Sequence, residues 1–238
     1  MEGLPLRSNI HCNRRGEAAA VALHGKREMP MKHGRRTWGI AVLLILALGL
    51  AAVAQEEVQT ESMTFTQPAL ITSIGQSAGA AQARVVALKA GLEATYMQRA
   101  TLEDLEGSST LIVVLGASSK GLGAAGVDID GEITWATELF DKARELEIRI
   151  IAMHIEGGSR RGPSSDLTIT TFAPLADYLI VKGSMPDTEW TADEAANGNA
   201  DGLFTTIAGE NEIPIAYIEA TLGAVDVLIE LFDIQPEG

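Results

Sequence analysis

The sequence predicts a single α/β domain built on a doubly wound, mainly parallel sheet of five strands. Short apolar runs alternate with stretches of helical periodicity between residues 68 and 233. Each run is continuously apolar, which is typical of strands that helices cover on both faces of the sheet. The chain shows no internal repeat and no second domain. These three observations indicate one core in three layers.

The first half of the domain supplies three strands, expected at residues 69–74, 94–97 and 111–115. A helix over 80–90 follows the first strand and stops at Gly91, because glycine commonly terminates helices. Thr101 and Asp104 form a pair typical of a helix start, so one helical turn is expected there. The third strand leads into a long loop of Gly, Ala, Ser and one Lys.

The second half supplies strands at 148–155 and 178–181, and 215–218 is a candidate for a short final strand. A long helix is expected over 130–146, because six apolar residues share one face: Ile133, Ala136, Leu139, Phe140, Ala143 and Leu146. Further helices are expected near 164–172, with Ser164 or Ser165 as the cap, and over 203–210 and 222–232. The polar stretch 184–202 is expected on the surface. This order favours the flavodoxin-like strand arrangement 2-1-3-4-5.

A targeting segment precedes the domain. Residues 31–36 are basic, 38–50 are almost wholly apolar, and Ala52-Val53-Ala54 matches an A-x-A cleavage site. This predicts a signal peptide over 31–54, cleaved after Ala54, with a core too short for a transmembrane span. The protein is therefore expected to be secreted or periplasmic, or anchored by its N-terminus if cleavage fails. Residues 1–30 are expected to be an untranslated or disordered extension, 55–67 a linker and 234–238 a tail.

The chain left after cleavage is acidic and contains no cysteine. Residues 55–238 hold 10 Lys and Arg against 29 Asp and Glu, a formal net charge of −19. Such a charge disfavours nucleic acid and anionic lipid as partners. Cys12 lies upstream, which excludes a disulfide framework and a thiol nucleophile in the domain. His154 is the one histidine after residue 54, and no carboxylate cluster accompanies it, so no metal site is expected.

The loop after the third strand contains a formal dinucleotide motif. Gly121, Gly123 and Gly126 satisfy G-x-G-x-x-G, but fourteen residues separate the strand from the helix that should follow directly. Tyr178 and Lys182 match the Tyr-x3-Lys of short-chain dehydrogenases. They lie on a predicted strand, where ~3.3 Å per residue places them ~13 Å apart. Nicotinamide binding is therefore not expected, nor is any other cofactor.

The first turn contains a formal nucleophile motif. Residues 75–79 read G-Q-S-A-G, a literal G-x-S-x-G between a strand and a helix. A serine hydrolase would use Ser77 with His154 and either Asp128 or Asp177. However, the motif follows the first strand, and the histidine ends a strand instead of lying on a late loop. The simpler interpretation is that Ser77 caps the helix.

Polar residues gather where the strands end. In a doubly wound sheet, ligands bind outside the carboxyl ends of the strands. The candidate ligand-binding residues at these ends are Ser73, Gln76, Ser77, Ser118, Ser119, Lys120, Gly121, His154, Glu156, Gly157, Gly158, Arg160, Arg161 and Lys182. Four of them are basic, and arginine, glycine-rich loops and helix N-termini all favour phosphate or carboxylate groups. The sequence therefore predicts a site for a small anionic ligand.

Two interpretations other than anion binding stay open. One is the serine hydrolase, and the other is a non-catalytic interaction domain of the cell envelope without a small ligand. For the second, Arg160 and Arg161 would pair with neighbouring carboxylates, while the glycines only permit turns. Labelling of Ser77 by a phosphonate would distinguish the hydrolase from an anion-binding domain and from an interaction domain.

Four segments resemble the blocks of an uncharacterised bacterial family of secreted or membrane-anchored α/β proteins, a domain of unknown function. They are T-S-I-G-Q-S at 72–77, V-L-G-A-S-S-K-G-L-G-A-A-G-V-D-I-D at 114–130, R-I-I-A-M-H-I-E-G-G-S-R-R-G at 149–162 and D-G-L-F-T-T-I-A-G-E-N-E-I-P at 201–214. The resemblance covers nearly all of 68–233. It implies a single envelope domain and no known activity, and Gly79 is incidental to the family pattern, which weakens the hydrolase interpretation.

Overall fold

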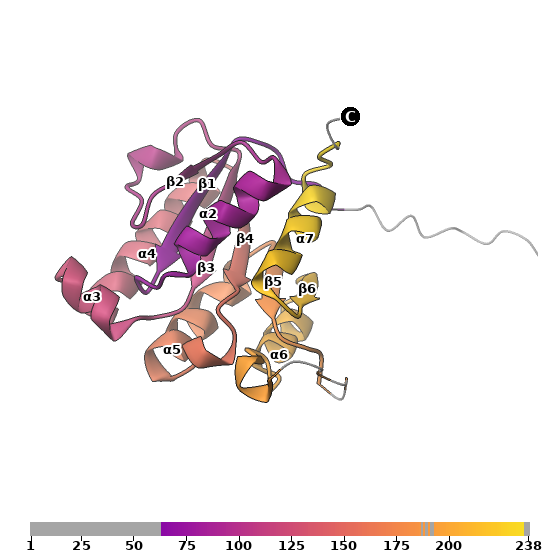
Figure 1. Cartoon of the computed structure of the whole chain (residues 1–238). Helices are drawn as coiled ribbons and strands as arrows, with labels where there is room; N and C mark the ends of the chain where they lie inside the picture. The colour runs from indigo at the N-terminus through magenta and orange to yellow at the C-terminus, as the bar shows by residue number, and fades with distance from the viewer. Residues whose placement is uncertain (1–62, 187, 189, 191–192, 236–238) are drawn as a thin grey trace, which may run out of the picture. The chain divides into compact units, whose positions relative to one another are not determined.

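The computed structural model describes residues 63–186, 188, 190 and 193–235, which fold around one parallel sheet (Figure 1). The predicted extension and signal peptide, and residues 55–62 of the predicted linker, lie outside the described residues. The strands are β1 (Ala69–Ile74), β2 (Ala94–Tyr96), β3 (Thr110–Leu115), β4 (Arg149–His154), β5 (Tyr178–Lys182) and β6 (Ile215–Ile218). Their order is β2-β1-β3-β4-β5-β6. The doubly wound α/β fold predicted from the sequence is confirmed.

The sheet has six strands, so the predicted number of five is wrong. The added strand is β6, which extends the flavodoxin-like order at the β5 edge, with Leu179 paired to Ile215 and Lys182 to Ile218. Only one of its four residues, Ile218, is buried. An edge strand has a single neighbour and less apolar cover, which is why its sequence signal is weak.

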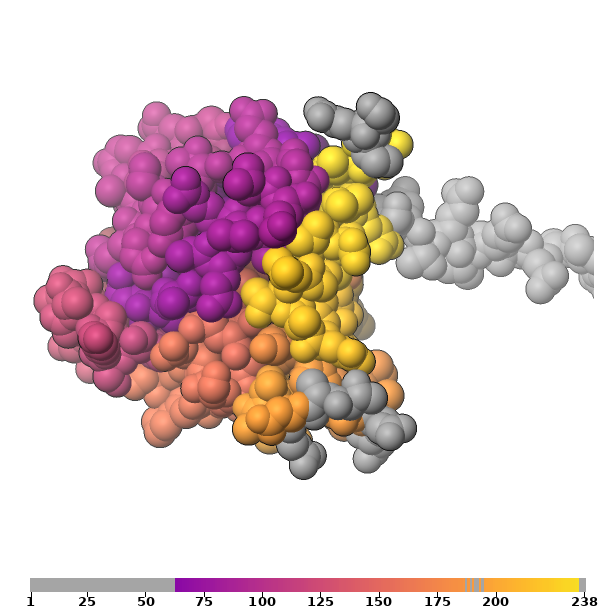
Figure 2. All heavy atoms as spheres, viewed as in Figure 1, coloured from indigo at the N-terminus to yellow at the C-terminus, as the bar shows by residue number. Residues whose placement is uncertain are grey.

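Among the described residues, five α-helices cover the two faces of the sheet, and a sixth, short one lies beside it (Figure 1). Their bounds are α2 (Gly79–Ala90), α3 (Ser119–Ala125), α4 (Ile129–Glu145), α5 (Pro163–Phe172), α6 (Leu203–Glu210) and α7 (Ala224–Leu231). Side chains of α4, α5 and α6 pack on one face, and those of α2 and α7 pack on the other. In Figure 2 the side chains of α2 and α7 lie next to each other on the visible face.

Two apolar layers stabilise this arrangement. Alternate residues of β3 supply them, with Leu111 and Val113 facing α4 to α6 and Ile112 facing α2 and α7. Each fully buried side chain of this size contributes roughly 1.5–3 kcal/mol. Phe65 is also buried at 3% exposure, so the packed domain includes the end of the predicted linker. Within the described residues, no helix combines the length and apolar character needed to cross a membrane.

Several local predictions need correction. Leu146 follows α4 and is 40% exposed, so the apolar face ends at Ala143. Gly162, not a serine, precedes α5, whose first residue is Pro163. The predicted surface excursion is partly buried, because Asn197 and Asn199 are 8% and 1% exposed. The Thr101–Asp104 pair is confirmed, since the Thr101 N–H and hydroxyl both donate to the Asp104 carboxylate at 2.7 and 2.9 Å.

The loop predicted after β3 contains a short helix, α3. Ser118 caps it by accepting a hydrogen bond from the Gly121 N–H at 3.1 Å, and Gly126 ends it with a φ of 68°. The glycines of the formal G-x-G-x-x-G motif therefore lie within and at the end of a helix. They do not form the tight strand-to-helix turn that carries a pyrophosphate.

The β1–α2 and β3–α3 loops pack directly against each other. Gln76 and Ala117 form an isolated antiparallel bridge between them. A Cβ atom at Gly121 would collide with the carbonyl oxygen of Gln76, and one at Gly75 would lie 2.6 Å from that of Gly116. Glycine is thus required at these positions because the two loops approach each other too closely for a side chain.

We expect Gly121→Ala to lower the free energy of unfolding by about 1–3 kcal/mol, because the backbone atoms at the contact have no flexible side chain to move aside. Gly123→Ala is the matched control in the same helix. No atom lies within 4 Å of its added Cβ, so it should be neutral or stabilise by up to ~1 kcal/mol. Urea unfolding of both variants measures the difference, and equal values would contradict the packing argument.

Candidate functional site at the carboxyl edge of the sheet

All six strands are parallel, so their carboxyl ends meet along one edge. The fourteen candidate residues come to this edge from β1, β3, β4 and β5 and from the loops that follow them. Ser73 and Ser77 are buried, and their hydroxyl groups form hydrogen bonds within the turn between β1 and α2. The Ser73 Oγ accepts from the Ser77 N–H at 3.1 Å, and the Ser77 Oγ accepts from the Gly79 N–H at 3.2 Å. Both hydroxyls therefore shape the start of α2.

Glu132 of α4 anchors this turn from the other side of the sheet edge. Its side chain is 0% exposed. Its Oε1 accepts from the Gly75 N–H at 3.0 Å and from the Gln76 Nε2 at 2.8 Å. Its Oε2 accepts from the Arg99 Nε at 3.3 Å. The side-chain amide of Gln76 therefore forms a structural hydrogen bond with a buried carboxylate.

The sequence analysis did not single out Glu132. It lies in register with the apolar positions of its helix, four residues before Ala136 and seven before Leu139. A charged residue among the buried positions of a helix indicates that another group must pair with it, because burying an unpaired charge is unfavourable. That signal was present, but it did not reveal which groups compensate the charge.

Lys120 lies in the first turn of α3 and is exposed, next to the equally exposed Ser119. Within the described part of the chain, the Lys120 ammonium group has no ion-pair partner. Lys120 is therefore a cation on the open surface of the edge, while Ser118 and Gly121 are taken up by the cap of α3.

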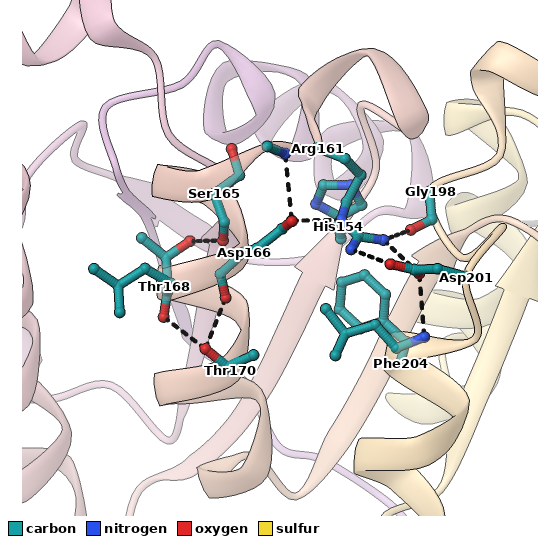
Figure 3. Close-up of polar contacts among 12 residues, drawn as sticks. His154, Arg161, Ser165, Asp166, Thr168, Thr170, Gly198, Asp201 and Phe204 are labelled. Atoms are coloured by element: carbon teal, nitrogen blue, oxygen red, sulfur yellow. Dashed lines mark hydrogen bonds and ion pairs between the residues drawn. The ribbon is translucent and has the colours of Figure 1, made fainter.

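His154 is buried at the end of β4, with 1% exposure. Its Nδ1 lies 2.9 Å from the Leu115 carbonyl oxygen, and its Nε2 lies 3.2 Å from that of Gly157. The ring packs on Phe204 with centroids 5.2 Å apart (Figure 3). Burial lowers the pKa of His154 below 6.5, although both carbonyls and Glu156 act to raise it, while Arg161 also lowers it. Burial thus favours the neutral imidazole, whose single N–H can donate to one of the two carbonyl oxygens, and the ring is a structural group.

We expect stability to fall as pH drops below the unfolded-state histidine pKa of 6.5. Below that pH the unfolded chain binds a proton that the folded chain still rejects, so the slope reaches about 1.4 kcal/mol per pH unit until the folded pKa is passed. Urea unfolding between about pH 7.5 and 5.5 measures this slope, which His154→Gln should remove. In NMR titration, the imidazole resonance that His154→Gln eliminates should have its midpoint below 6.5; a higher midpoint would contradict the assignment.

The structure does not assemble the hydrolase triad. The Ser77 hydroxyl is turned to the Gly79 N–H, and both nitrogens of His154 face backbone carbonyls. Asp128 caps α4 by accepting from the Gly131 N–H at 2.8 Å. Asp177 accepts from the Ile150 N–H at 2.7 Å, near the amino end of β4 and so at the opposite edge of the sheet. These four residues hold local structure.

Arg161 joins three segments of the chain (Figure 3). Its Nε donates to Asp166 of α5 at 2.6 Å, and its two terminal nitrogens donate to the Asp201 carboxylate at 2.9 and 2.7 Å. Nη1 also donates to the Gly198 carbonyl at 2.7 Å. The side chain is 14% exposed. Hydrogen bonding to Asp201 raises the pKa of Arg161, and the same bond lowers that of Asp201. Arg161 is therefore a clamp with four of its five N–H groups used.

Arg160 is differently placed and is 29% exposed. Its Nε and Nη2 lie 3.0 and 2.9 Å from Glu156 Oε1, and its Nη1 donates to the Ala117 carbonyl at 3.3 Å. These contacts use three of its five N–H groups, so one on each terminal nitrogen has no protein partner among the described residues. The predicted pairing of arginines with local carboxylates is thus complete for Arg161 and partial for Arg160.

The remaining candidates lie next to the loop that follows β5. Added Cβ atoms at Gly157 and Gly158 would collide with the carbonyls of Ala196 and Ala195, so these glycines allow loop contact. Lys182 ends β5 and is half-buried, and it too has no ion pair within the described residues. A hollow of about 250 Å³ adjoins it at the ends of β5 and β6, lined by Gly183, Ser184, Met185, Thr188, Trp190, Tyr217 and Glu219.

Two larger hollows lie away from the carboxyl edge. One of about 470 Å³ is acidic and lies between the segment 102–106 and α4, and one of about 620 Å³ lies between the C-terminal ends of α2 and α7. Among the residues that the structure describes, no group of three or more His, Cys, Asp or Glu side chains could hold a metal ion.

Comparison with known proteins identifies the family. A search of curated proteins found no match. Two solved structures are similar at low TM-score. A psychrotrophic esterase from Pseudoalteromonas sp. is 12% identical with a TM-score of 0.29, covering 61% of this chain and 97% of the esterase. A GDSL-like lipase from Bacteroides thetaiotaomicron is 11% identical with a TM-score of 0.28, covering 73% of this chain and 76% of the lipase. Such low TM-scores support no functional inference.

The family match covers the whole of the sheet and its helices. It spans residues 66–232, from just before β1 to just after α7. The match confirms that the four sequence blocks belong to an uncharacterised family, a domain of unknown function. The chain belongs to the family described as domain of unknown function (DUF6305).

Proposed function

We propose that the protein binds a small anionic ligand, bearing a phosphate or carboxylate group, at the carboxyl edge of the sheet. The observation that carries the proposal is the unused donor pair of Arg160. Glu156 holds one edge of the guanidinium and the Ala117 carbonyl accepts from Nη1, which leaves one N–H on each terminal nitrogen without an acceptor among the described residues. Two parallel N–H groups are the geometry with which arginine binds an oxyanion in bidentate fashion.

The surroundings of Arg160 favour the same ligand. Lys120 and Lys182 follow β3 and β5, the two strands that flank β4, and neither is neutralised by a carboxylate within the described residues. Two ammonium groups at this edge favour an anionic partner in a chain whose net charge is −14. Arg161, by contrast, is removed from the predicted ligand contacts, because Asp166 and Asp201 already satisfy it.

Binding is tested by thermal unfolding of the purified protein with inorganic phosphate, nucleotides and carboxylates at matched ionic strength. A ligand that binds only the folded state raises the melting temperature. Arg160→Lys keeps a positive charge beside Glu156 but lacks the fork, so the anion should bind about tenfold more weakly. Arg144→Lys is the matched control, because Arg144 lies in the last turn of α4, at the opposite edge. The proposal fails if no anion stabilises the protein, or if both variants respond alike.

We further propose that the protein is exported by a signal peptide over residues 31–54. The support is the basic segment, apolar core and A-x-A site of the sequence. Mass spectrometry of protein recovered from culture medium or periplasm should find Gln55 as the first residue. A chain that is retained in the membrane with residues 31–54 attached would contradict cleavage.

A further inference from the structure

One oxygen of Glu156 is unexplained by the contacts of the fold. Its carboxylate is 8% exposed, and Oε1 receives both contacts from Arg160. Its Oε2 is buried and has no hydrogen-bond partner, the one such side-chain atom within the described residues. A buried acceptor without a partner destabilises the fold, and more so when it is charged. Native proteins retain few such groups, and those that persist call for an explanation in terms of water, an ion or function.

This oxygen lies beneath the part of the sheet edge where doubly wound folds commonly bind ligands. Oε2 lies against the first residue of α2, since a Cβ atom added to Gly79 would be 2.8 Å from it, and one added to Gly116 would be 3.7 Å away. These two glycines belong to the connections that leave β1 and β3. Helices leave these neighbouring strands toward opposite faces of the sheet, α2 to one and α4 to the other. This is the switch point at which doubly wound sheets bind ligands.

Glu156 and Arg160 offer complementary halves of one recognition surface. Arg160 has two spare donors for an oxyanion, and the carboxylate that orients it has one spare acceptor. Because the two groups are joined as an ion pair, a ligand that uses both must carry its donor close to its oxyanion. Oε2 is buried in this structure, so a contact with a ligand requires the Glu156 side chain to turn outward while it keeps its pairing with Arg160.

We propose that the ligand is a carboxylate with a hydrogen-bond donor on the adjacent carbon, as in α-hydroxy and α-amino acids. The carboxylate pairs with the outer N–H groups of Arg160, and the hydroxyl or ammonium group donates to Glu156 Oε2. This inference rests on the proposed anion site and narrows its ligand class. Simple carboxylates such as propionate and succinate satisfy Arg160 but leave Oε2 without a partner.

The test compares acids that differ only in the donor. Thermal unfolding and calorimetric titration would use propionate, lactate and alanine, and in parallel succinate, malate and aspartate. A hydrogen bond to a charged group is expected to give the hydroxy or amino acid about 10- to 100-fold higher affinity than its parent acid. Comparing the affinities of the hydroxy acids with those of the amino acids then identifies the preferred donor group. A preference for either one agrees with the proposed contact.

Glu156→Gln provides a specific check. Arg160 requires an oxygen, so the glutamine should place its carbonyl at the Oε1 position and its NH₂ group at the Oε2 position. The acceptor becomes a donor, so the ratio between the affinities for donor-bearing and parent acids should fall from about 10- to 100-fold to about one. Glu145→Gln on the exposed surface of α4 is the control and should keep the preference.

The outcomes separate the two proposals. If parent and donor-bearing acids bind wild-type protein equally, the ligand class is wrong and the anion site stands. If no acid and no phosphate binds, the anion site fails and this inference fails with it. The wild-type comparison decides the matter even if Glu156→Gln is unstable.

Discussion

Glu132→Ala is expected to lower the free energy of unfolding by about 3–5 kcal/mol. The substitution removes a fully buried carboxylate that accepts from the Gly75 N–H, the Gln76 amide and the Arg99 guanidinium. Three donors would lose their acceptor at once, two of them in buried groups. The loss also leaves a cavity beneath the turn between β1 and α2, so the turn itself should loosen.

Two matched variants test this account in urea unfolding. Glu132→Gln keeps an oxygen for Gly75 and Gln76 but turns an NH₂ group toward Arg99, so a smaller loss of about 1–2 kcal/mol is expected. Glu145→Ala removes a carboxylate of the same helix that is 68% exposed, and should change stability by less than about 0.5 kcal/mol. A loss below about 1 kcal/mol for Glu132→Ala would show that the buried contacts are not what holds the turn.

Arg161→Ala is expected to lower the free energy of unfolding by about 2–4 kcal/mol. Without the guanidinium, the carboxylates of Asp166 and Asp201 and the Gly198 carbonyl lose a common donor. The size of the loss is moderated because Asp166 and Asp201 are 37% and 59% exposed and can turn to water. Arg161→Lys should recover less than half of it, because an ammonium group cannot reproduce the planar fork.

The acid side of the stability curve gives an independent measure of this clamp. The folded pKa of Asp201 lies below its ordinary 3.8, chiefly because Arg161 donates to it. Its contribution is therefore complete above about pH 4 and is lost as pH falls through the lowered folded pKa. Arg161→Ala should lose less stability over that range than wild type. An identical acid profile for the two proteins would show that the ion pair contributes nothing in solution.

The two neighbouring arginines illustrate how tertiary partners assign roles. The sequence places Arg160 and Arg161 together on the loop after β4 and predicts the same anion contact for both. In the structure, Arg161 meets a carboxylate forty residues away, while Arg160 keeps two donors unpaired. Their expected phenotypes differ accordingly, with loss of stability for Arg161→Ala and loss of anion binding for Arg160→Lys.

The sequence by itself determined the order of the elements, the three-layer architecture and the edge at which polar residues collect. Those properties follow from local patterns, because continuous apolar runs, helical periodicity and strand direction are set by neighbouring residues. The helix α3, inside its glycine-rich loop, carried too little local signal to be predicted, and the weakly buried β6 could be named only as a candidate strand at 215–218.

Only the tertiary structure decided which polar groups are available. Histidine, glutamine and serine carry chemistry in many proteins, yet here His154 lies between backbone carbonyls, Gln76 donates to Glu132 and Ser77 accepts from an N–H group. Conversely, Glu156 has a spare acceptor because no donor of the fold reaches it. Hydrogen bonding acts over about 3 Å between residues that are distant in the sequence, so its pairing depends on the packing of loops. Local composition can nominate such groups, but it cannot show which of them the fold leaves unsatisfied.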